Sequence, residues 1–312
     1  MLSYLFADDT TCLDSDKCLK NLFNRVNQEL HKISTWYCAN KLAVNVNKTK
    51  FIIFRSRGKQ INLDGLNLQL NFNEIGHENN PEKIHIIERI YTNHPNINLQ
   101  TYKLLGVLFD EYLNFNRHVQ VLTSKLAKTL FFIGQTRNFI SAKAAKTIYY
   151  SLFHSHLLYA IIITSCTTPS NLSKITVLQK KAIRAVSGSG YYDHTEQLFS
   201  LLNILPFEKL ITEAKLKFMH SIVFNYHHPS FANVWKKNEP RERGYLLRNS
   251  DEFEMPPVNI ELFRRMPLYT LPKLWNSLGD LRFQTNRATF MISLKNILLS
   301  ADQAALTSLS VT

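Results

Sequence analysis

The chain has 312 residues and a formal net charge of +13 at pH 7, from 37 Lys and Arg against 24 Asp and Glu. Its 45% hydrophobic and 20% charged residues are typical of a folded protein of about two or three compact units, and they exclude an intrinsically disordered chain. The four cysteines include no Cys-x-x-Cys pair and no secretory signal precedes them, which argues against a disulfide framework and a zinc site of paired cysteines. We therefore expect an intracellular protein, nuclear or cytoplasmic and not secreted.

The first pattern along the chain is an apolar run, Leu2–Phe6, followed by Ala7-Asp8-Asp9-Thr10 and by a return run, Thr11–Leu13. This pattern predicts a β-hairpin with Asp8 and Asp9 at its tip. Magnesium usually binds one or two protein carboxylates together with substrate phosphates, and a metal pair can activate an attacking oxygen and stabilise a leaving one. Asp8 and Asp9 are therefore candidate ligands for two-metal phosphoryl transfer. The alternative is an ordinary solvated turn, since Asp is common in turns.

A long amphipathic helix is predicted next, because apolar residues recur at spacings of three and four from Leu19 to Tyr37. Asp14, Ser15 and Asp16 are available to cap its first turn. Residues 40–54 then predict a turn and a strand that ends in an apolar run. Residues 62–100 are rich in Asn and interrupted by Gly and Pro, so we expect a loop-rich insertion there.

The middle of the chain is strongly basic. Residues 111–190 contain ten Lys and Arg but one acidic residue, Glu111, whereas residues 1–110 carry 13 basic and 11 acidic residues and residues 191–312 carry 14 and 12. The ten are Arg117, Lys125, Lys128, Arg137, Lys143, Lys146, Lys174, Lys180, Lys181 and Arg184. A local excess of +9 predicts a polyanionic partner.

The same basic segment predicts three helices. Their expected apolar stripes are Val119, Leu122, Leu126, Leu130 and Ile133; Ile148, Leu152, His156 and Tyr159; and Leu172, Ile175, Leu178, Ala182 and Val186. Lys125 and Lys128 lie away from the first stripe. The alternative is a solvated helical bundle without a ligand. The most apolar stretch, residues 157–166, is too short to cross a bilayer, so we expect no membrane partner.

The C-terminal part predicts further helices. Residues 191–228 favour two, with Pro206 at the start of the second. From Pro229 onward, repeated prolines predict short pieces, and Arg287–Leu299 predicts a closing helix. His154 and His156, and likewise His227 and His228, are poorly spaced for a zinc pair.

Four ordered motifs resemble the reverse transcriptases of non-LTR retrotransposons, particularly the jockey-like group. The family pattern is an aromatic-Ala-Asp-Asp hairpin, a helix ending in Trp, an Asn-x-Leu-x-x-Asn-x-x-Lys-Thr segment closing on Phe, and a Leu-Gly-Val strand leading to a His. The corresponding residues here are Phe6 to Asp9, Trp36, Asn40 to Phe54 with Asn45, Lys48 and Thr49 in register, and Leu105 to Val107 leading to His118. Weaker similarity extends through Leu274–Leu278, so the resemblance covers nearly the whole chain.

The resemblance implies an α+β fold: a partial polymerase palm made of a hairpin, a helix and strands, followed by a mostly helical thumb and C-terminal region. It divides the chain into four parts. These are a palm remnant with the Asp-Asp hairpin (1–61), an insertion with a primer-supporting hairpin (62–118), a basic helical thumb (119–190), and a helical C-terminal region with Pro-rich breaks (191–312).

The resemblance also implies roles for individual residues. Asp8 and Asp9 match the palm aspartates that hold Mg²⁺ or Mn²⁺, with Asp8 as the direct ligand, and Lys48 matches a lysine that approaches the leaving pyrophosphate. Leu105 and Gly106 match the hairpin that supports the primer end. A solvated lysine and an ordinary packed strand are the respective alternatives. The expected thumb residues that bind nucleic acid are Lys125, Lys128, Lys143, Lys146, Lys180, Lys181 and Arg184.

The implied partners are an RNA template, an RNA/DNA or DNA primer duplex and, in the full enzyme, deoxynucleoside triphosphates. A palm also requires a third aspartate, a nucleotide-selecting loop and fingers before the hairpin, and only Met1 to Leu5 precede it here. We therefore expect a fragment of an RNA-directed DNA polymerase that is inactive alone and binds its metal ion only within a complete palm. The alternative is a non-catalytic nucleic-acid-binding module derived from a reverse transcriptase.

Overall fold

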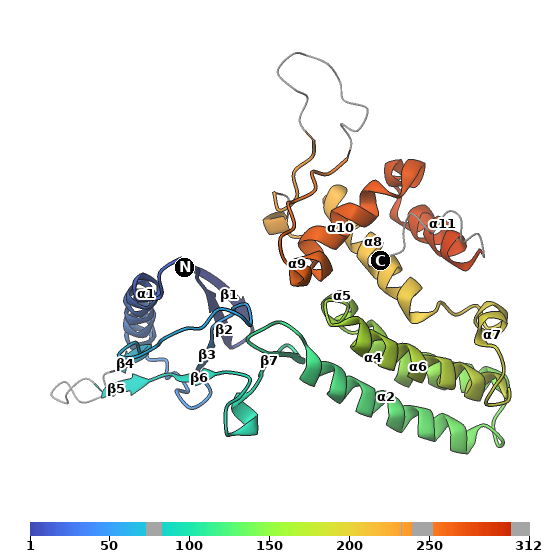
Figure 1. The fold of residues 1–312 in the computed structure, drawn as a ribbon, viewed down its shortest axis with the longest axis horizontal. Helices are drawn as coiled ribbons and strands as arrows, with labels where there is room; N and C mark the ends of the chain where they lie inside the picture. Colours follow the sequence, from blue (N-terminus) through green and yellow to red (C-terminus); the bar gives the residue numbers. More distant parts are fainter. Residues whose placement is uncertain (73–82, 232, 239–251, 301–312) are drawn as a thin grey trace, which may run out of the picture. The chain divides into compact units, whose positions relative to one another are not determined.

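A computed structural model describes residues 1–72, 83–231, 233–238 and 252–300 (Figure 1). The chain divides into two compact units, residues 1–113 and residues 114–312. The first combines one long helix with short strands, and the described part of the second is almost entirely helical. The expected α+β class, with a helical body after the strands, is confirmed. The finer division into four parts stays a prediction.

The first unit contains four small two-stranded sheets among its described residues. Its elements are β1 (Leu2–Phe6), β2 (Asp9–Leu13), α1 (Leu19–Ala39), β3 (Lys50–Ile52), β4 (Gln69–Phe72), β5 (Lys83–Ile86), β6 (Glu88–Ile90), the 3₁₀ turn η1 (Ile97–Leu99), β7 (Tyr102–Leu104) and β8 (Val107–Phe109). Strands β1 and β2, β4 and β5, and β7 and β8 pair antiparallel, while β3 pairs with β6 in parallel. The predicted N-terminal hairpin and long helix are confirmed.

The core of the first unit forms where α1 packs on β4. Phe23 of α1 is buried together with Leu68, Leu70 and Ile87. The side chain of Asn27 fixes this contact, since its Nδ2 donates to the carbonyl of residue 67 and its Oδ1 accepts from the amide of residue 69. The segment that we expected to be loop-rich therefore contributes strands and core residues. Its residues 73–82 lie outside the described part of the chain.

The second unit is built from helices in sequence. Its elements are α2 (Asn116–Thr136), α3 (Ala142–Ile148), the π turn η2 (Tyr149–His154), α4 (Ser155–Leu158), α5 (Ile161–Thr164), α6 (Pro169–Ser187), α7 (Thr195–Leu201), α8 (Phe207–Val223), η3 (Pro229–Phe231), α9 (Glu261–Arg265), α10 (Pro267–Asn276), η4 (Gly279–Phe283) and α11 (Arg287–Leu299). The predicted first, third and closing helices are confirmed, as are the two helices expected between residues 191 and 228.

The stripe predicted for the middle basic helix was wrong. Leu152 and Tyr159 are exposed, and the buried side chains are instead Tyr149, Phe153 and Leu157. These three repeat every fourth residue, a spacing that drifts by about 40° per step around an α-helix. The π turn at residues 149–154 widens the helix at this point and changes which side chains face the core.

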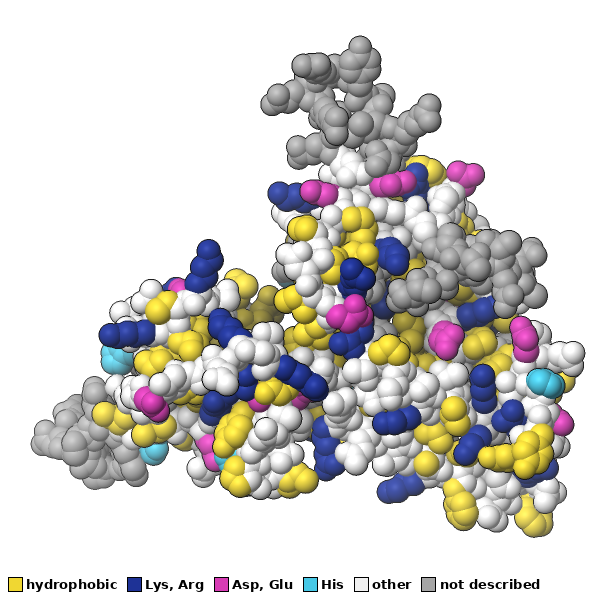
Figure 2. Space-filling view, viewed as in Figure 1, with side chains coloured by type: hydrophobic (Ala, Val, Ile, Leu, Met, Phe, Trp, Pro, Cys, Tyr) yellow, Lys and Arg dark blue, Asp and Glu magenta, His cyan; other side chains and the backbone are white. Residues whose placement is uncertain are grey.

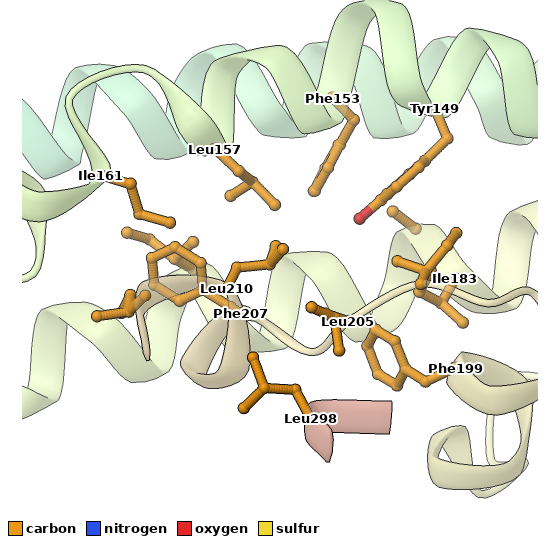
Figure 3. Close-up of a cluster of buried hydrophobic side chains, with 14 of the residues drawn as sticks. Tyr149, Phe153, Leu157, Ile161, Ile183, Phe199, Leu205, Phe207, Leu210 and Leu298 are labelled. Carbon is orange, nitrogen blue, oxygen red and sulfur yellow. The ribbon is translucent and has the colours of Figure 1, made fainter. Parts of the chain in front are cut away.

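The core of the second unit lies between this bulged helix and the helices that follow it. Figure 3 shows Tyr149, Phe153 and Leu157 pointing from one helix toward Ile183 and Phe207 on others. A buried polar side chain, Gln179, crosses the same region, and its Nε2 donates to the hydroxyl of Tyr149 and to the carbonyl of Leu205, both at 3.0 Å. These bonds fix the position of α6 against the bulged helix.

Pro272 lies inside α10, although we expected it to break the chain. A proline within a helix leaves the carbonyl four residues earlier without its usual amide donor. Here that carbonyl belongs to Leu268, and the indole Nε1 of Trp235 donates to it at 3.2 Å. The helix continues because a side chain from elsewhere replaces the missing bond. Among the described helices, none is long and apolar enough to span a lipid bilayer.

Candidate metal ligands and nucleic-acid interface

The Asp-Asp hairpin turns more tightly than the sequence predicts. Phe6 pairs directly with Asp9, so Ala7 and Asp8 form a two-residue loop and Asp9 already belongs to β2. Ala7 has φ 52°, in the left-handed region that suits a two-residue hairpin loop. The side chains of Asp8 and Asp9 are both exposed at this tip. The hairpin thus presents two adjacent carboxylates to solvent.

The nearest acidic residues after the hairpin are already engaged. Arg25 of α1 donates from its Nε to Asp14 at 2.7 Å and from its Nη1 to Asp16 at 2.9 Å. The hydrogen bond from Arg25 lowers the pKa of Asp14. In the part of the chain that the structure describes, no group of three or more His, Cys, Asp or Glu side chains is arranged to hold a metal ion. Asp8 and Asp9 are therefore two adjacent carboxylates, and no third ligand is arranged beside them among the described residues.

The faces of the same hairpin are apolar and uncovered. Leu2, Tyr4 and Phe6 alternate along β1 and are 65%, 53% and 63% exposed, and Leu5 on the opposite face is 77% exposed. Among the described strands, β1 and β2 pair only with each other. Exposed apolar strands with unpaired edges favour association with further strands. The hairpin therefore exposes apolar faces and strand edges of a kind that suits pairing with further strands.

Lys48 lies in a turn just before β3. The amide of Lys48 donates to the backbone carbonyl of Asn45 and, at 3.2 Å, to its side-chain Oδ1, and the hydroxyl of Thr49 donates to the same Asn45 carbonyl. The Asn-x-x-Lys-Thr motif thus forms the turn itself. The side chain of Lys48 is exposed. The structure places it in the turn two residues before β3 and does not assign it a partner.

Leu105 and Gly106 form the loop of the hairpin β7–β8. Leu104 pairs with Val107, and the two loop residues have φ 46° and φ 83°. Two successive positive φ values are typical of a type I′ turn, in which glycine is well suited and leucine is strained. Leu105 is nevertheless half exposed at the tip. The predicted hairpin is present, and an apolar side chain is held at its end at a conformational cost.

A buried ion-pair cluster behind this hairpin was missed by the sequence reasoning. Glu111 is 2% exposed, and its Oε2 accepts from Arg55 Nε at 3.1 Å and from Arg89 Nη2 at 3.2 Å. Its Oε1 accepts from the amide of Thr92. Arg55 also donates to the hydroxyl of Tyr112 and lies over its ring, 5.0 Å from the centroid. The one signal in the sequence was the isolation of Glu111 as the single acid in a basic segment.

Three of the ten basic residues lie on one side of α2. Arg117, Lys125 and Lys128 are spaced by eight and three residues, which aligns them along the helix, and all three are exposed. Burial lowers the pKa of His118 on the same helix, and the charge of Lys125 lowers it further. The exposed side of α2 therefore carries three positively charged side chains.

The other predicted basic residues lie on α3 and α6. Lys143 is exposed and Lys146 half-buried on α3. On α6, Arg184 lies one helical turn after both Lys180 and Lys181, and Lys174 lies two turns before Lys181 on the same side of the helix. The structure thus brings the candidates together in one helical body but spreads them over three helices. Figure 2 shows Lys and Arg side chains distributed over the visible face of the helical unit, together with several acidic side chains.

The positive charge of these helices is not neutralised within the described residues. Residues 114–192 contain no Asp or Glu, and none of the ten basic residues forms an ion pair with a described carboxylate. A shallow hollow of about 420 Å³ lies between α2 and α6 and is lined by Thr123, Ser173, Lys174, Val177 and Leu178. A shallow, positively charged surface of this kind is better suited to binding the phosphate groups of a large polyanion than to enclosing a small molecule.

Comparison with known proteins supports the resemblance carried by the motifs. The chain is 24% identical over 234 residues to the RNA-directed DNA polymerase from the mobile element jockey of Drosophila melanogaster, which covers 73% of this chain and 22% of that protein. It is 23% identical over 217 residues to the jockey polymerase of Drosophila funebris, covering 68% of this chain and 21% of the relative. It is also 27% identical over 113 residues to a probable RNA-directed DNA polymerase from transposon BS of Drosophila melanogaster, over 35% of this chain and 12% of that protein.

These similarities confirm that the chain has relatives among the RNA-directed DNA polymerases of non-LTR mobile elements. The chain spans about a fifth of the length of the jockey relatives. No protein-family model matches it, and no solved structure gave a match.

Proposed function

We propose that this chain carries the part of a retrotransposon RNA-directed DNA polymerase that runs from the Asp-Asp hairpin through the thumb to the C-terminal region. The observation that supports this most is the helical body of residues 114–192, which holds ten basic residues and no acidic one. Lys and Arg on such a body neutralise the phosphates of a duplex and give affinity without reading its sequence. A template-primer duplex is the partner that this chemistry and the relatives together favour. Its place of action is inside the cell, in the nucleus or cytoplasm.

In the complete enzyme, Asp8 and Asp9 would contribute carboxylates to a site for Mg²⁺ or Mn²⁺, with Asp8 as the direct ligand. The ions would supply activation of the primer hydroxyl and stabilisation of the leaving pyrophosphate of a deoxynucleoside triphosphate. Lys48, Leu105 and Gly106 keep their proposed roles near the pyrophosphate and the primer end. The exposure of both aspartates fits this use, since ligands for a substrate-bound metal ion must face the substrate.

The thumb role falls to the basic residues on α2, α3 and α6. Their side chains would hold an RNA template paired with a DNA or RNA primer by its phosphate groups. The buried stripes of these helices form one core, so the basic side chains stand on a rigid body. Such a body can keep a duplex in place while its sequence changes from one step of synthesis to the next.

The isolated chain is expected not to extend a primer. Its two carboxylates stand at the tip of a hairpin whose edges are unpaired and whose faces are exposed, so the sheet that would orient them for catalysis is not formed by the described strands. Incubation of the purified chain with an RNA template, a DNA primer, deoxynucleoside triphosphates and Mg²⁺ or Mn²⁺ should yield no product. Template-directed extension that is lost in the Asp8→Asn variant would show that the isolated chain is an enzyme.

Binding to nucleic acid tests the proposal itself. A variant with Lys125, Lys128, Lys180 and Lys181 replaced by Ala should bind an RNA/DNA hybrid more weakly than the unaltered chain by roughly tenfold or more. The matched control replaces four exposed lysines outside the basic helices, Lys17, Lys20, Lys236 and Lys237, and removes the same total charge. It should keep most of the affinity. Equal losses in both variants would mean that net charge alone, and not this helical body, binds the hybrid.

A non-catalytic nucleic-acid-binding module is the second candidate. The basic helices, whose buried side chains belong to the core of the second unit, favour it, because such a body can bind a duplex without any metal site. The two candidates share the binding experiment. They differ in whether polymerase activity appears when the chain is joined to the segment that precedes the hairpin in a jockey relative.

A further inference from the structure

A tight turn between α6 and α7 presents two tyrosine rings to solvent. Helix α6 ends at Gly188, whose φ of 73° is the usual left-handed cap. The next residues fold back at once, since the amide of Gly190 donates to Asp193 Oδ2 at 2.7 Å. Tyr191 and Tyr192 stand at the tip of this turn, 66% and 90% exposed. Their rings contact each other edge to face with centroids 5.1 Å apart.

The turn is anchored to the helix that precedes it. Arg184, in the last turn of α6, donates from its Nε to the backbone carbonyl of Asp193 at 2.9 Å. The amide of Ser189 donates to the carbonyl of Arg184 at 3.1 Å. The backbone on both sides of the two tyrosines is therefore fixed. A turn with a fixed backbone loses little further backbone freedom when it binds a ligand, which favours recognition.

The residues on either side of the turn include three positively charged side chains, which favour an anionic ligand. Lys180, Lys181 and Arg184 occupy the last two turns of α6, the helix that leads into the turn with the tyrosines. The two acidic residues that follow are Asp193, whose carboxylate accepts from Gly190, and Glu196 on α7. Exposed aromatic rings beside several cations are the combination that binds single-stranded nucleic acid, in which bases stack on rings and phosphates meet Lys and Arg.

We propose that Tyr191 and Tyr192 form a stacking platform for unpaired nucleobases of a single strand that continues beyond a duplex bound to the helical body. This inference rests on the proposed function, because the basic helices must hold the duplex. A duplex end keeps its bases stacked on one another, whereas an unpaired base offers its face to a tyrosine ring. The platform would therefore distinguish a hybrid with a single-stranded extension from a blunt one.

The test compares two RNA/DNA hybrids of equal duplex length, one blunt and one with a single-stranded RNA extension that carries a fluorescent adenine analogue. The protein variants are Tyr191→Leu/Tyr192→Leu, which keeps apolar surface without rings, and Tyr191→Phe/Tyr192→Phe, which keeps the rings. The Leu variant should bind the extended hybrid roughly tenfold more weakly and the blunt hybrid unchanged. The Phe variant should match the unaltered chain on both. Stacking should quench the fluorescent base in the unaltered chain and the Phe variant, and not in the Leu variant.

The outcomes separate this inference from the function on which it rests. Binding of both hybrids with no difference between the Leu and Phe variants would overturn the stacking platform and leave the helical body as the binding surface. Loss of blunt-hybrid binding in the Leu variant would overturn it as well, because the tyrosines would then act on the duplex. No binding of either hybrid by the unaltered chain would overturn both proposals. Thermal unfolding of each variant tests whether the fold is retained.

Discussion

Replacement of Glu111 by Gln is expected to lower the free energy of unfolding of the first unit by about 3 to 5 kcal/mol. The carboxylate is buried and accepts from two guanidinium groups, those of Arg55 and Arg89. Removing the charge of Glu111 leaves both partly buried guanidinium groups without this counter-charge. Glutamine also has only one acceptor oxygen, whereas the carboxylate accepts hydrogen bonds at two. Because Glu111 follows β8 by two residues, the hairpin β7–β8 should lose its support first.

The measurement is amide hydrogen exchange across residues 1–113, with and without the substitution. The control is Glu88→Gln, which breaks the pair between Glu88 and Lys50 on neighbouring strands, where Glu88 is 47% exposed. An exposed pair contributes about 1 kcal/mol or less, so the control should change exchange little. If Glu111→Gln accelerates exchange no more than the control does, the cluster is not what holds the hairpin to the rest of the unit.

Replacement of Lys215 by Met is expected to stabilise the second unit at pH 7 by roughly 3 kcal/mol. Lys215 on α8 is 3% exposed, and burial lowers its pKa from 10.5 to about 8. The difference between these two values is the free energy by which folding penalises the charged ammonium, and one pKa unit is about 1.36 kcal/mol. Methionine has a similar length and no charge, so it fills the same space without that penalty.

The advantage of Lys215→Met depends on pH. Below pH 8 Lys215 is charged in the folded and in the unfolded chain, so the whole cost of burying the charge destabilises the folded chain. Between pH 8 and 10.5 the folded state binds fewer protons than the unfolded state, so the stability of the unaltered chain rises with pH and the advantage of Met shrinks. Urea unfolding at pH 7 and pH 10 measures both effects.

Lys217→Met is the matched control for this pH experiment, since Lys217 lies on the same helix but is half exposed and paired with Glu213. It should not stabilise the chain at either pH. A loss of stability in Lys215→Met at pH 7 would mean that the ammonium has a favourable partner that offsets its burial.

Long regular helices were predictable from the sequence because their spacing is set by the helix itself. The stripes of α1, α2 and α6 follow the 3.6-residue period, and burial alone explains them. The buried face of the middle basic helix was not predictable, because a π turn changes the helical period at Tyr149 and no residue type in the sequence indicates that change. Pro272 predicted a break where the helix in fact continues. The hydrogen bond that the proline cannot make is replaced by one from Trp235, a residue distant in sequence.

The candidate site was predictable in identity but not in geometry. The hairpin motif located Asp8 and Asp9, yet only the pairing of Phe6 with Asp9 shows how tight the loop is. The Glu111 cluster has no local pattern, since Arg55 and Arg89 reach it from 56 and 22 residues away. Tyr191 and Tyr192 are two adjacent residues in a loop, and the sequence does not indicate that they are exposed. The turn that presents them is formed by hydrogen bonds of Arg184 and Asp193.

The most direct test of the central claim is the salt dependence of binding between this chain and a labelled RNA/DNA hybrid. If the helical body neutralises phosphates, the logarithm of the affinity should fall linearly with the logarithm of the salt concentration, by about 0.9 for each phosphate contacted. The slope should become shallower in the variant that lacks Lys125, Lys128, Lys180 and Lys181, and stay unchanged in the variant that lacks four lysines elsewhere. An affinity that does not respond to salt, or equal slopes in all three proteins, would contradict a duplex-binding thumb.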